Sequence, residues 1–443
     1  MRQSGVAASH CSVFPKFLAE KRFLARSRHS YNGCGAMSNE LSLTERSHQM
    51  FVYDNVRCFF TGIIEGGFKT FVLLIAIRVF HASDICKATL ASIGFAGLLF
   101  APITVNVASK LTNVPATRIC MFYFILIACL LVTGICMHSF GGYFVIIALA
   151  RILFKQYIPL MVDVYGHNYS KSERGYRLSC VLMVLPIATA IFSPIGGFIL
   201  DAGLENYRLI LLIIALASIG TAYAFHKIPS RPIPLQEDSS LLSNFKVIFR
   251  DKLFFAMLIL MTLTGIANQM TFPLRAEYLA NEKYGINISN FSTTLIITTI
   301  PYCCRMLSSI FWGKLFDRLS VMRMRVIVNL FLLLEFIFFF NSTSVFMLSL
   351  SAVFMGLGYG GGEVLWCLWV TKIVDKNKLS QYMSADTAFV GMRSFISPFI
   401  GYLLLGCGCS FSCIGNVAAL LVLVSSIGCF LMRKHARFLK NYD

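Results

Sequence analysis

The sequence predicts an all-α polytopic membrane protein with twelve transmembrane helices arranged as two six-helix bundles. Of its 443 residues, 57% are apolar and 14% are charged, whereas roughly 25% of the residues of a soluble domain are charged. The apolar residues occur in runs of about 20, which is the length of helix that spans a bilayer. A helix also pairs its own backbone polar groups, as the lipid interior requires.

The segment before the first apolar run, residues 1–50, is polar and basic and has no continuous apolar stretch. We expect a cytoplasmic tail without fixed structure. Its composition also fits a transit peptide, and translation could instead start at Met37. A second, shorter cytoplasmic tail is expected over 435–443.

Twelve apolar runs follow the first tail, and each is predicted to cross the membrane. The longest internal break, 228–252, contains three prolines and is expected to be a cytoplasmic linker between a bundle over 51–227 and a bundle over 253–434. The predicted spans are 57–79, 88–109, 118–138, 142–164, 178–200, 207–226, 253–273, 290–312, 326–341, 344–371, 384–406 and 411–432.

Basic residues predict the orientation of these spans. The chain has a net charge of +18. If the basic loop Gly313–Arg325 is cytoplasmic, the loops and tails on its side carry most of the 39 Lys and Arg residues. The positive-inside rule then places both termini in the cytoplasm. We expect the membrane to be a plasma (inner) membrane. This distribution explains the charge without a nucleic-acid partner.

No cofactor or metal is expected. The 15 cysteines are scattered, many in apolar runs where a thiol behaves as a small hydrophobe. Cys407, Cys409 and Cys413 cluster near an outer loop but have no His or acidic residue nearby in sequence. The chain also lacks a phosphate-binding loop and the His-Glu-x-x-His and Gly-x-Ser-x-Gly motifs, which disfavours ATP-driven and enzymatic functions. A membrane-embedded enzyme and a non-transporting sensor remain alternatives.

A short motif occurs in both halves of the chain. Ser-Pro-Ile-Gly-Gly in the fifth span resembles Ser-Pro-Phe-Ile-Gly in the eleventh span. Pro bends a membrane helix, and Gly allows close helix contact. The residues expected to bend these helices are Pro194, Gly196, Gly197, Pro398 and Gly401. Repetition in matching spans favours an internal duplication.

Gly313, Asp317, Arg318 and Arg323, between the eighth and ninth spans, resemble the signature loop of the major facilitator superfamily. The fourth span, with Arg151, and the fifth-span Pro-Gly motif resemble further motifs of that family. The resemblance extends from about residue 50 to 435. It implies a monomeric secondary transporter of a small solute, in which two bundles rock about a central cavity. In the family the first, fourth, seventh and tenth helices line that cavity.

The resemblance also implies a gating role for the signature loop. Asp317 would face the start of the fifth helix, near Arg177 and Ser179, and would stabilise one closed state. Helix N-termini favour acidic groups, which fits this role.

Ionisable residues inside predicted spans mark a candidate site, because charge is costly in the membrane. We expect Lys69, Arg151 and Lys155 to bind the anionic part of a substrate, together with the amides of Asn268 and Gln269. These residues lie on the helices that the resemblance places around the cavity. The predicted substrate is an anionic organic metabolite.

Two carboxylates in the same helices, Glu65 and Glu363, are candidates to carry a coupled proton. Glu65 and Lys69 are four residues apart on one helix face and can pair. Alternatively, all these charges form a structural salt-bridge network. A further alternative is a multidrug or cation efflux pump centred on Glu65 and Glu363.

Other charges lie in the remaining spans. Asp386 and Arg393 are seven residues apart on one helix face, and we expect them to pair at the interface between the halves. Arg305 is assigned to the same structural class. Trp366 and Trp369 are interpreted as interfacial anchors, with stacking on a ligand ring as the alternative.

Glu335 in the ninth span has no evident partner. It could snorkel to the membrane surface, stay protonated or contact Asn329.

Overall fold

The fold is that of a computed structural model, which describes residues 42–111, 113–137, 139–170, 174–233, 251–284, 286–374 and 379–435. These ranges contain helices and no strand. Leu43–Asp443 forms one compact unit. The expected N-terminal tail up to residue 41 and most of the expected linker, 234–250, lie outside the described residues.

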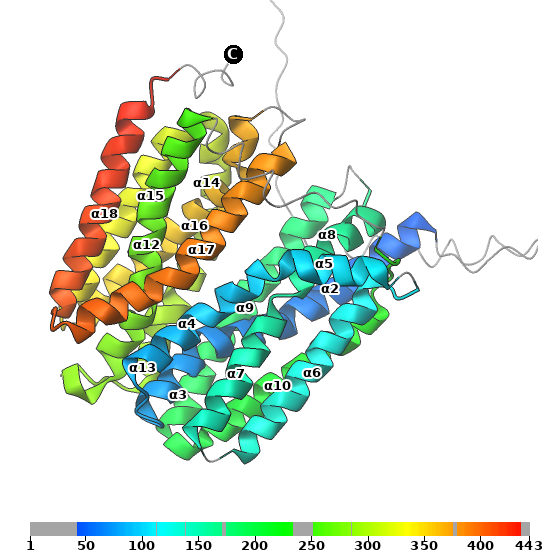
Figure 1. The fold of residues 1–443 in the computed structure, drawn as a ribbon, viewed down its shortest axis with the longest axis horizontal. Coiled ribbons are helices and arrows are strands. Elements are labelled where there is room, and N and C mark those ends of the chain that lie inside the picture. Colours follow the sequence, from blue (N-terminus) through cyan, green and yellow to red (C-terminus); the bar gives the residue numbers. More distant parts are fainter. Residues whose placement is uncertain are drawn as a thin grey trace, which may run out of the picture. The chain divides into compact units, whose positions relative to one another are not determined.

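The N-terminal bundle consists of the helices coloured blue to green in Figure 1. α2, a π-helical turn and α3 are continuous and form one long span. The bounds are α2 (Leu43–Gly66), the π-helical turn (Gly67–Phe71), α3 (Val72–Arg78), α4 (Asp84–Leu99), α5 (Ala101–Lys110), α6 (Ala116–Cys136), α7 (Phe140–Phe154), α8 (Tyr157–Asn168), α9 (Arg174–Asp201) and α10 (Tyr207–Lys227).

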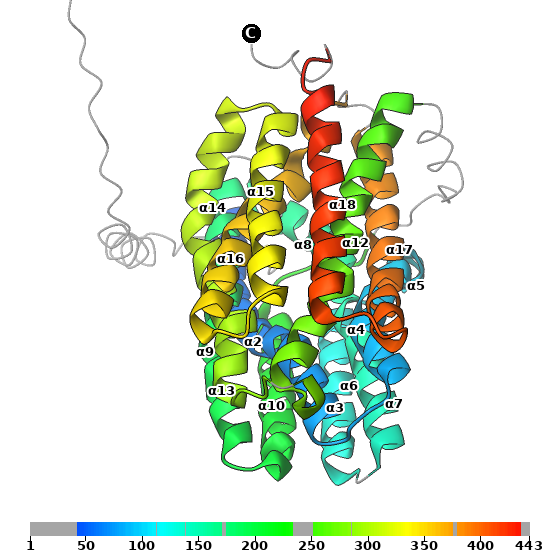
Figure 2. The same cartoon turned by 90° about the vertical axis from the view of Figure 1, so that its left-hand side faces the viewer.

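The C-terminal bundle consists of the helices coloured green to red, which run alongside one another in Figure 2. A second π-helical turn joins α13 to α14. The bounds are α12 (Lys252–Ala280), α13 (Asn290–Thr294), the π-helical turn (Leu295–Thr299), α14 (Ile300–Arg318), α15 (Val321–Phe340), α16 (Val345–Leu368), α17 (Leu379–Gly406) and α18 (Phe411–Met432).

Ten of the described spans are long and apolar enough to cross a membrane, and α4 with α5 makes an eleventh if that bent pair is one span. α15 is the twelfth helical segment, and its 20 residues include the charged Arg323, Arg325 and Glu335. The order of these helical segments follows the twelve predicted spans, and the protein is a multi-pass helical membrane protein.

Each bundle has its own hydrophobic core. In the N-terminal bundle the buried ring of Phe124 lies 6.0 Å from that of Phe154 and 5.5 Å from that of Phe225. In the C-terminal bundle Phe254 stacks on Trp369 with ring centroids 5.2 Å apart. Apart from Ala276 and Ala280 in the first core and Ala88 in the second, each core is packed within one half of the chain, so each bundle is largely a packing unit of its own.

α2 and α12 extend further than predicted, because polar residues at their ends are held by neighbouring helices. α2 begins at Leu43 rather than at residue 57, so the helix takes in the end of the expected tail; Arg46 donates a hydrogen bond to His167 at 2.8 Å. α12 continues through Pro273 to Ala280, although we expected the seventh span to end at this proline.

The expected signature loop Gly313–Arg325 is mostly helical. α14 runs on to Arg318 and α15 begins at Val321, so only two residues connect them. Ser320 caps α15 by accepting a hydrogen bond from the backbone N–H of Arg323. The loop prediction was too long because basic residues were read as loop, whereas they are compatible with helix ends.

The two bundles meet through α4 against α17 and through α9 against α13 and α14. We call the helix ends at the predicted cytoplasmic loops the inner ends and the opposite helix ends the outer ends. Several polar contacts between the bundles lie toward the outer ends. Lys87 pairs with Glu277 at 2.7 Å, and Asp201 accepts a hydrogen bond from the backbone N–H of Asn290 at 2.7 Å. These contacts hold the bundles together on the outer side.

Candidate functional site

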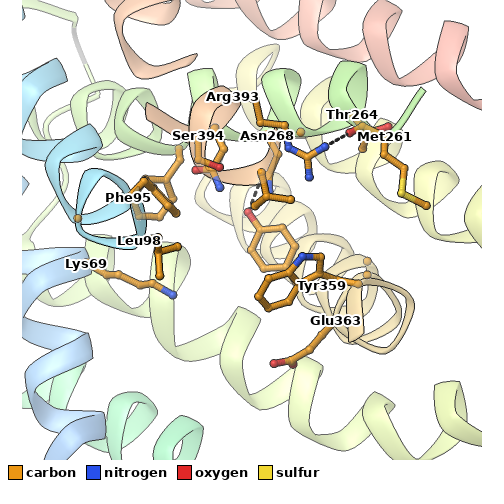
Figure 3. Close-up of a pocket in the computed structure, with 18 of the residues that line it drawn as sticks. Lys69, Phe95, Leu98, Met261, Thr264, Asn268, Tyr359, Glu363, Arg393 and Ser394 are labelled. Atoms are coloured by element: carbon orange, nitrogen blue, oxygen red, sulfur yellow. Dashed lines mark hydrogen bonds between the residues drawn. The ribbon is translucent and has the colours of Figure 1, made fainter. Parts of the chain in front are cut away.

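A cavity of about 430 Å³ lies between the two bundles and is lined by both. In Figure 3, Lys69 projects into view on one side, and Asn268, Tyr359, Glu363 and Arg393 lie on the other. All seven residues that the sequence suggested for substrate or proton binding line this cavity: Glu65, Lys69, Arg151, Lys155, Asn268, Gln269 and Glu363. The structure therefore brings them together, while their roles remain predictions.

Irregular backbone places the two lysines of the N-terminal bundle. Lys69 lies in the π-helical turn, and π-helical turns are frequent at functional sites. Lys155 lies at the break between α7 and α8. Glu65 pairs with Lys69 at 2.9 Å, as their spacing predicted, and with Lys155 at 3.2 Å. One carboxylate thus neutralises one of two lysines.

A tyrosine links this cluster to the C-terminal bundle. Lys69 Nζ donates a hydrogen bond to the hydroxyl of Tyr302 at 2.9 Å. The Arg305 guanidinium lies over the same ring and pairs with Glu363 at 2.5 Å. Arg305 therefore lines the cavity and pairs with Glu363 there, whereas we expected it to have only a structural role.

Three arginines that line the cavity, Arg151, Arg325 and Arg393, have no ion-pair partner within the described ranges. Arg151 is 7% exposed, and its guanidinium packs beside Gly94, where a side chain would crowd it. The sequence suggested that Arg151 and Lys155 need anionic partners. Glu65 pairs with Lys155, whereas Arg151 has no carboxylate partner among the described residues.

The side-chain amide of Asn268 is oriented by two donors. Its Oδ1 accepts hydrogen bonds from Arg275 at 3.3 Å and from the Tyr359 hydroxyl at 2.6 Å. Because a guanidinium only donates, the oxygen must face Arg275. The amide N–H groups of Asn268 are then free to face the cavity, where they can donate to an anionic or acceptor group.

A buried ion pair stands behind this amide. Arg275 pairs with Glu335 at 2.9 Å, and their exposed fractions are 2% and 0%. This contact shows that Glu335 neither snorkels nor contacts Asn329. Sequence reasoning missed Arg275 because it lies beyond Pro273, where we expected the span to end.

The expected pair of Asp386 and Arg393 does not form. Arg393 donates to the backbone oxygen of Met261 at 2.7 Å, and Asp386 accepts from Trp369 Nε1 at 3.3 Å. Both lie on α17 and line the cavity. Seven residues of helix separate them by about 10 Å along the axis, so each side chain finds a nearer partner.

The two tryptophans have different places. Trp369 is fully buried, so its interpretation as an interfacial anchor was wrong. Trp366 is half-exposed and lines the cavity. It offers an aromatic face to a bound solute.

The predicted gating residue Asp317 is exposed near the inner end of α14 and makes no hydrogen bond or ion pair with the described residues. The predicted contact of Asp317 with Arg177 and Ser179, which would join the two bundles at their inner ends, is therefore not formed in this conformation. Its charge acts on Lys372. Burial lowers the pKa of Lys372, and Asp317 partly opposes this change.

The repeated Pro-Gly motif lies at close helix contacts. Pro194 and Pro398 lie inside α9 and α17. Gly196 packs against the ring of Phe71, Gly197 against the backbone of α13, and Gly401 against a backbone carbonyl of α12. These contacts explain the glycines, and the bending role stays a prediction.

The described residues contain no group of three or more His, Cys, Asp or Glu side chains that could hold a metal ion. The cysteines among them are free, including Cys407, Cys409 and Cys413.

Comparisons with known proteins identify the family. The model of the Major Facilitator Superfamily matches residues 58–294 and 258–440. A variant of the nucleoside transporter NupG superposes with a TM-score of 0.72 at 14% identity, covering 87% of this chain and 100% of that chain. The peptide transporter POT in complex with sulfate gives 0.69 at 12% identity, covering 90% and 99%.

A bacterial homologue of the human lysosomal transporter Spinster gives a TM-score of 0.63 at 13% identity, covering 91% of this chain and 99% of that chain. No curated protein matches the sequence. These identities show the shared fold alone, and the family match covers most of the chain. The chain belongs to the Major Facilitator Superfamily and is a transporter rather than an enzyme.

Proposed function

We propose that the protein is a secondary active transporter that moves a small organic anion across the membrane by alternating access. The observation that carries this proposal is the charge of the cavity. Six cations face three carboxylates there. The cations are Lys69, Arg151, Lys155, Arg305, Arg325 and Arg393, and the carboxylates are Glu65, Glu363 and Asp386.

The pairing of these charges supports an anionic substrate. Glu65 is shared by two lysines and Glu363 is held by Arg305, so the unpaired charges that remain are mainly positive. A cavity of about 430 Å³ is in the range of small-molecule sites. The Asn268 amide and the half-exposed Trp366 add a donor and an aromatic face.

The same pairing argues against the cation efflux pump. An organic cation needs a carboxylate that is open to it, but Glu65 and Glu363 are each in contact with a protein cation. Asp386 is 2% exposed and accepts a hydrogen bond from Trp369.

Coupling to a proton or a counter-solute would use Glu65 or Glu363. The Glu363 side chain is 47% exposed, against 12% for Glu65, so Glu363 has the easier access to water. Protonation of Glu363 would release Arg305 for the substrate.

We propose that the protein is a monomer in the plasma (inner) membrane, and its loop charges favour an orientation with both termini in the cytoplasm. The polar contacts between the outer ends then correspond to a state that is closed toward the outside. The signature-loop residues Gly313, Asp317, Arg318 and Arg323 would act when the inner ends close.

Thermal unfolding of the detergent-purified protein with a panel of solutes tests this function. The panel contains carboxylates, sugar phosphates and nucleotides beside neutral sugars, amino acids and cationic drugs. A ligand that binds the native state raises the unfolding midpoint. We expect anions alone to raise it, and we expect Arg151→Ala and Lys155→Ala to abolish the effect.

Lys314→Ala is the matched control, because Lys314 is exposed on α14 and does not line the cavity. It should keep the anion response. Stabilisation by cationic drugs alone would overturn the proposal in favour of an efflux pump. Uptake of the stabilising anion by proteoliposomes, with and without a pH gradient, then tests transport and coupling.

A further inference from the structure

Arg325 on α15 and Arg393 on α17 line the C-terminal part of the cavity wall without an ion-pair partner among the residues that the structure describes. Arg325 is only 9% exposed. The Nε atoms of both arginines are buried and have no hydrogen-bond partner. Burying a guanidinium without a counter-ion is costly, so this arrangement needs negative charge from elsewhere.

One carboxylate stands near both arginines. The charge of Asp386 acts on each of them, and the two guanidinium groups also repel each other. Asp386 forms no ion pair with either arginine and is instead hydrogen-bonded to Trp369. A single carboxylate cannot neutralise two arginines, and a positive excess remains in this part of the wall.

The backbone around Arg393 is shaped to hold its guanidinium in place. Nη1 donates to the carbonyl of Met261 at 2.7 Å, drawn as a dashed line in Figure 3. Gly265 lies directly against the guanidinium, and a side chain at that position would displace it. Ser394, the next residue of α17, also lines the cavity and adds a hydroxyl.

We propose that Arg325 and Arg393 form a subsite for one oxyanion group of the transported solute, and that this solute is a small organic dianion such as a phosphate monoester or a dicarboxylate. The proposal rests on the anion transport proposed above. Guanidinium groups bind such oxygens through paired, charge-assisted hydrogen bonds. Arg151 of the N-terminal bundle supplies a third unpaired cation. With Asp386 subtracted, the excess is two positive charges, which a dianion neutralises.

A dianion bound in this way would contact both bundles. Its binding would then depend on the relative position of the bundles, as a solute that couples to alternating access requires.

The test measures the affinity of the purified full-length protein for defined probes from thermal shifts. The probes are ribose 5-phosphate with ribose as its neutral match, succinate with succinamide as its neutral match, and acetate as a monoanion. We expect the dianions to bind and their neutral matches to have no effect. Arg325→Gln and Arg393→Gln should each weaken dianion binding by roughly ten- to a hundredfold.

Asp386→Asn distinguishes a subsite from a merely structural cluster. Removal of this negative charge should strengthen dianion binding, by roughly tenfold, because it no longer competes for the arginines. A structural role would change the unfolding midpoint of the free protein without raising affinity. If a glutamine variant does not fold, Arg325→Lys and Arg393→Lys keep the charge, and together with Asp386→Asn they decide the question.

The outcomes separate the two proposals. Dianion binding that Arg325→Gln and Arg393→Gln weaken and Asp386→Asn strengthens supports the subsite, and the preferred probe identifies phosphate or carboxylate. Anion binding that Arg151→Ala abolishes but that all three C-terminal variants leave unchanged overturns the subsite and keeps the anion transporter. Preference for acetate over both dianions also overturns it. If no anion stabilises the wild type, the proposed function fails and the subsite with it.

Discussion

At the scale of single residues, the polar network behind the cavity depends on one buried charge pair. Glu335 and Arg275 pair with each other, and Arg275 donates to Asn268 Oδ1, which leaves the amide N–H groups to face the cavity. Glu335 Oε2 and Arg275 Nη1 have no further hydrogen-bond partner. The pair is therefore only partly satisfied, and removal of one partner leaves the other as a buried, uncompensated charge.

We predict that Glu335→Leu lowers the free energy of unfolding by about 3–5 kcal/mol, because it leaves Arg275 unpaired. The double variant Glu335→Leu/Arg275→Met should regain most of this loss, since two apolar side chains replace the pair. Denaturation in mixed detergent micelles measures both values. A single variant as stable as the wild type would contradict the buried pair.

The same network predicts an effect on binding. Tyr359→Phe removes one of the two donors to Asn268 Oδ1, so the amide loses part of its fixed orientation. Anion affinity should fall by roughly three- to tenfold, as the loss of about one hydrogen bond implies. Tyr223→Phe, on the exposed surface of α10, is the matched control and should have no effect.

At the scale of helices, glycines set how closely the spans approach. Gly401 of α17 packs against the backbone carbonyl of Met270 in α12, and a Cβ at this position would collide with that carbonyl. Backbone cannot move aside as a flexible side chain can. The close contact of α12 and α17 therefore depends on this glycine.

Gly401→Ala should destabilise the protein by about 1–3 kcal/mol, the usual cost of overpacking. Gly406→Ala on the same helix is the control, because nothing lies within 4 Å of a Cβ there. Thermal unfolding of both variants measures the difference. Equal midpoints would show that α17 can shift away from α12 at no cost.

A lysine side chain donates hydrogen bonds to backbone oxygens at the C-terminal end of α14. Lys372, from the segment after α16, donates hydrogen bonds to the backbone oxygens of Phe316 and, at 3.3 Å, of Leu319. A cation at a helix C-terminus also interacts favourably with the helix dipole. This contact joins the inner end of α14 to the inner end of α16.

We expect Lys372→Ala to lower the free energy of unfolding by about 1–2 kcal/mol, through the lost hydrogen bonds and dipole interaction. Lys314→Ala, an exposed position on the same α14, should change it by less than about 0.5 kcal/mol. Proteolysis of the connection between α14 and α15 should also become faster in Lys372→Ala. Identical stability of the two variants would argue against this capping role.

At the scale of the whole molecule, the polar contacts toward the outer ends bias the two bundles to one arrangement. Glu277 is the centre of these contacts. It pairs with Lys87 at 2.7 Å and accepts hydrogen bonds from Tyr402 at 3.1 Å and from Asn281 at 2.5 Å. Lys87 belongs to the other bundle, so this carboxylate ties α12 to α4.

Glu277→Ala should shift the population toward a state that is open at the outer ends, because Lys87 loses its partner in the other bundle. Spin labels at Gly141 and Thr343, exposed positions at the outer ends of the two bundles, report this change as a longer distance in pulsed electron resonance. Asp84→Ala is the control, since Asp84 pairs with Lys87 within the same bundle. An unchanged distance in Glu277→Ala would exclude Glu277 as an outer latch.

The sequence by itself determined the features that depend on local chemistry. Runs of apolar residues gave the membrane class, the all-α fold and the order of the spans, because each span needs only its own hydrogen bonds and length. The spacing of Glu65 and Lys69 gave their ion pair, since four residues of helix bring side chains together. Residue types, with the family resemblance, also marked five of the nine charged side chains that line the cavity, but not Arg305, Arg325, Asp386 and Arg393.

Only the tertiary structure decided which charges neutralise one another. Lys155 meets Glu65, Arg305 meets Glu363 and Arg275 meets Glu335, and each pair joins different spans. Such partners depend on how helices pack, which local spacing does not encode. For the same reason Asp386 and Arg393, although close in sequence, have other partners. The arginines of the cavity that lack an ion pair became apparent only once the acidic groups of the described residues had been placed.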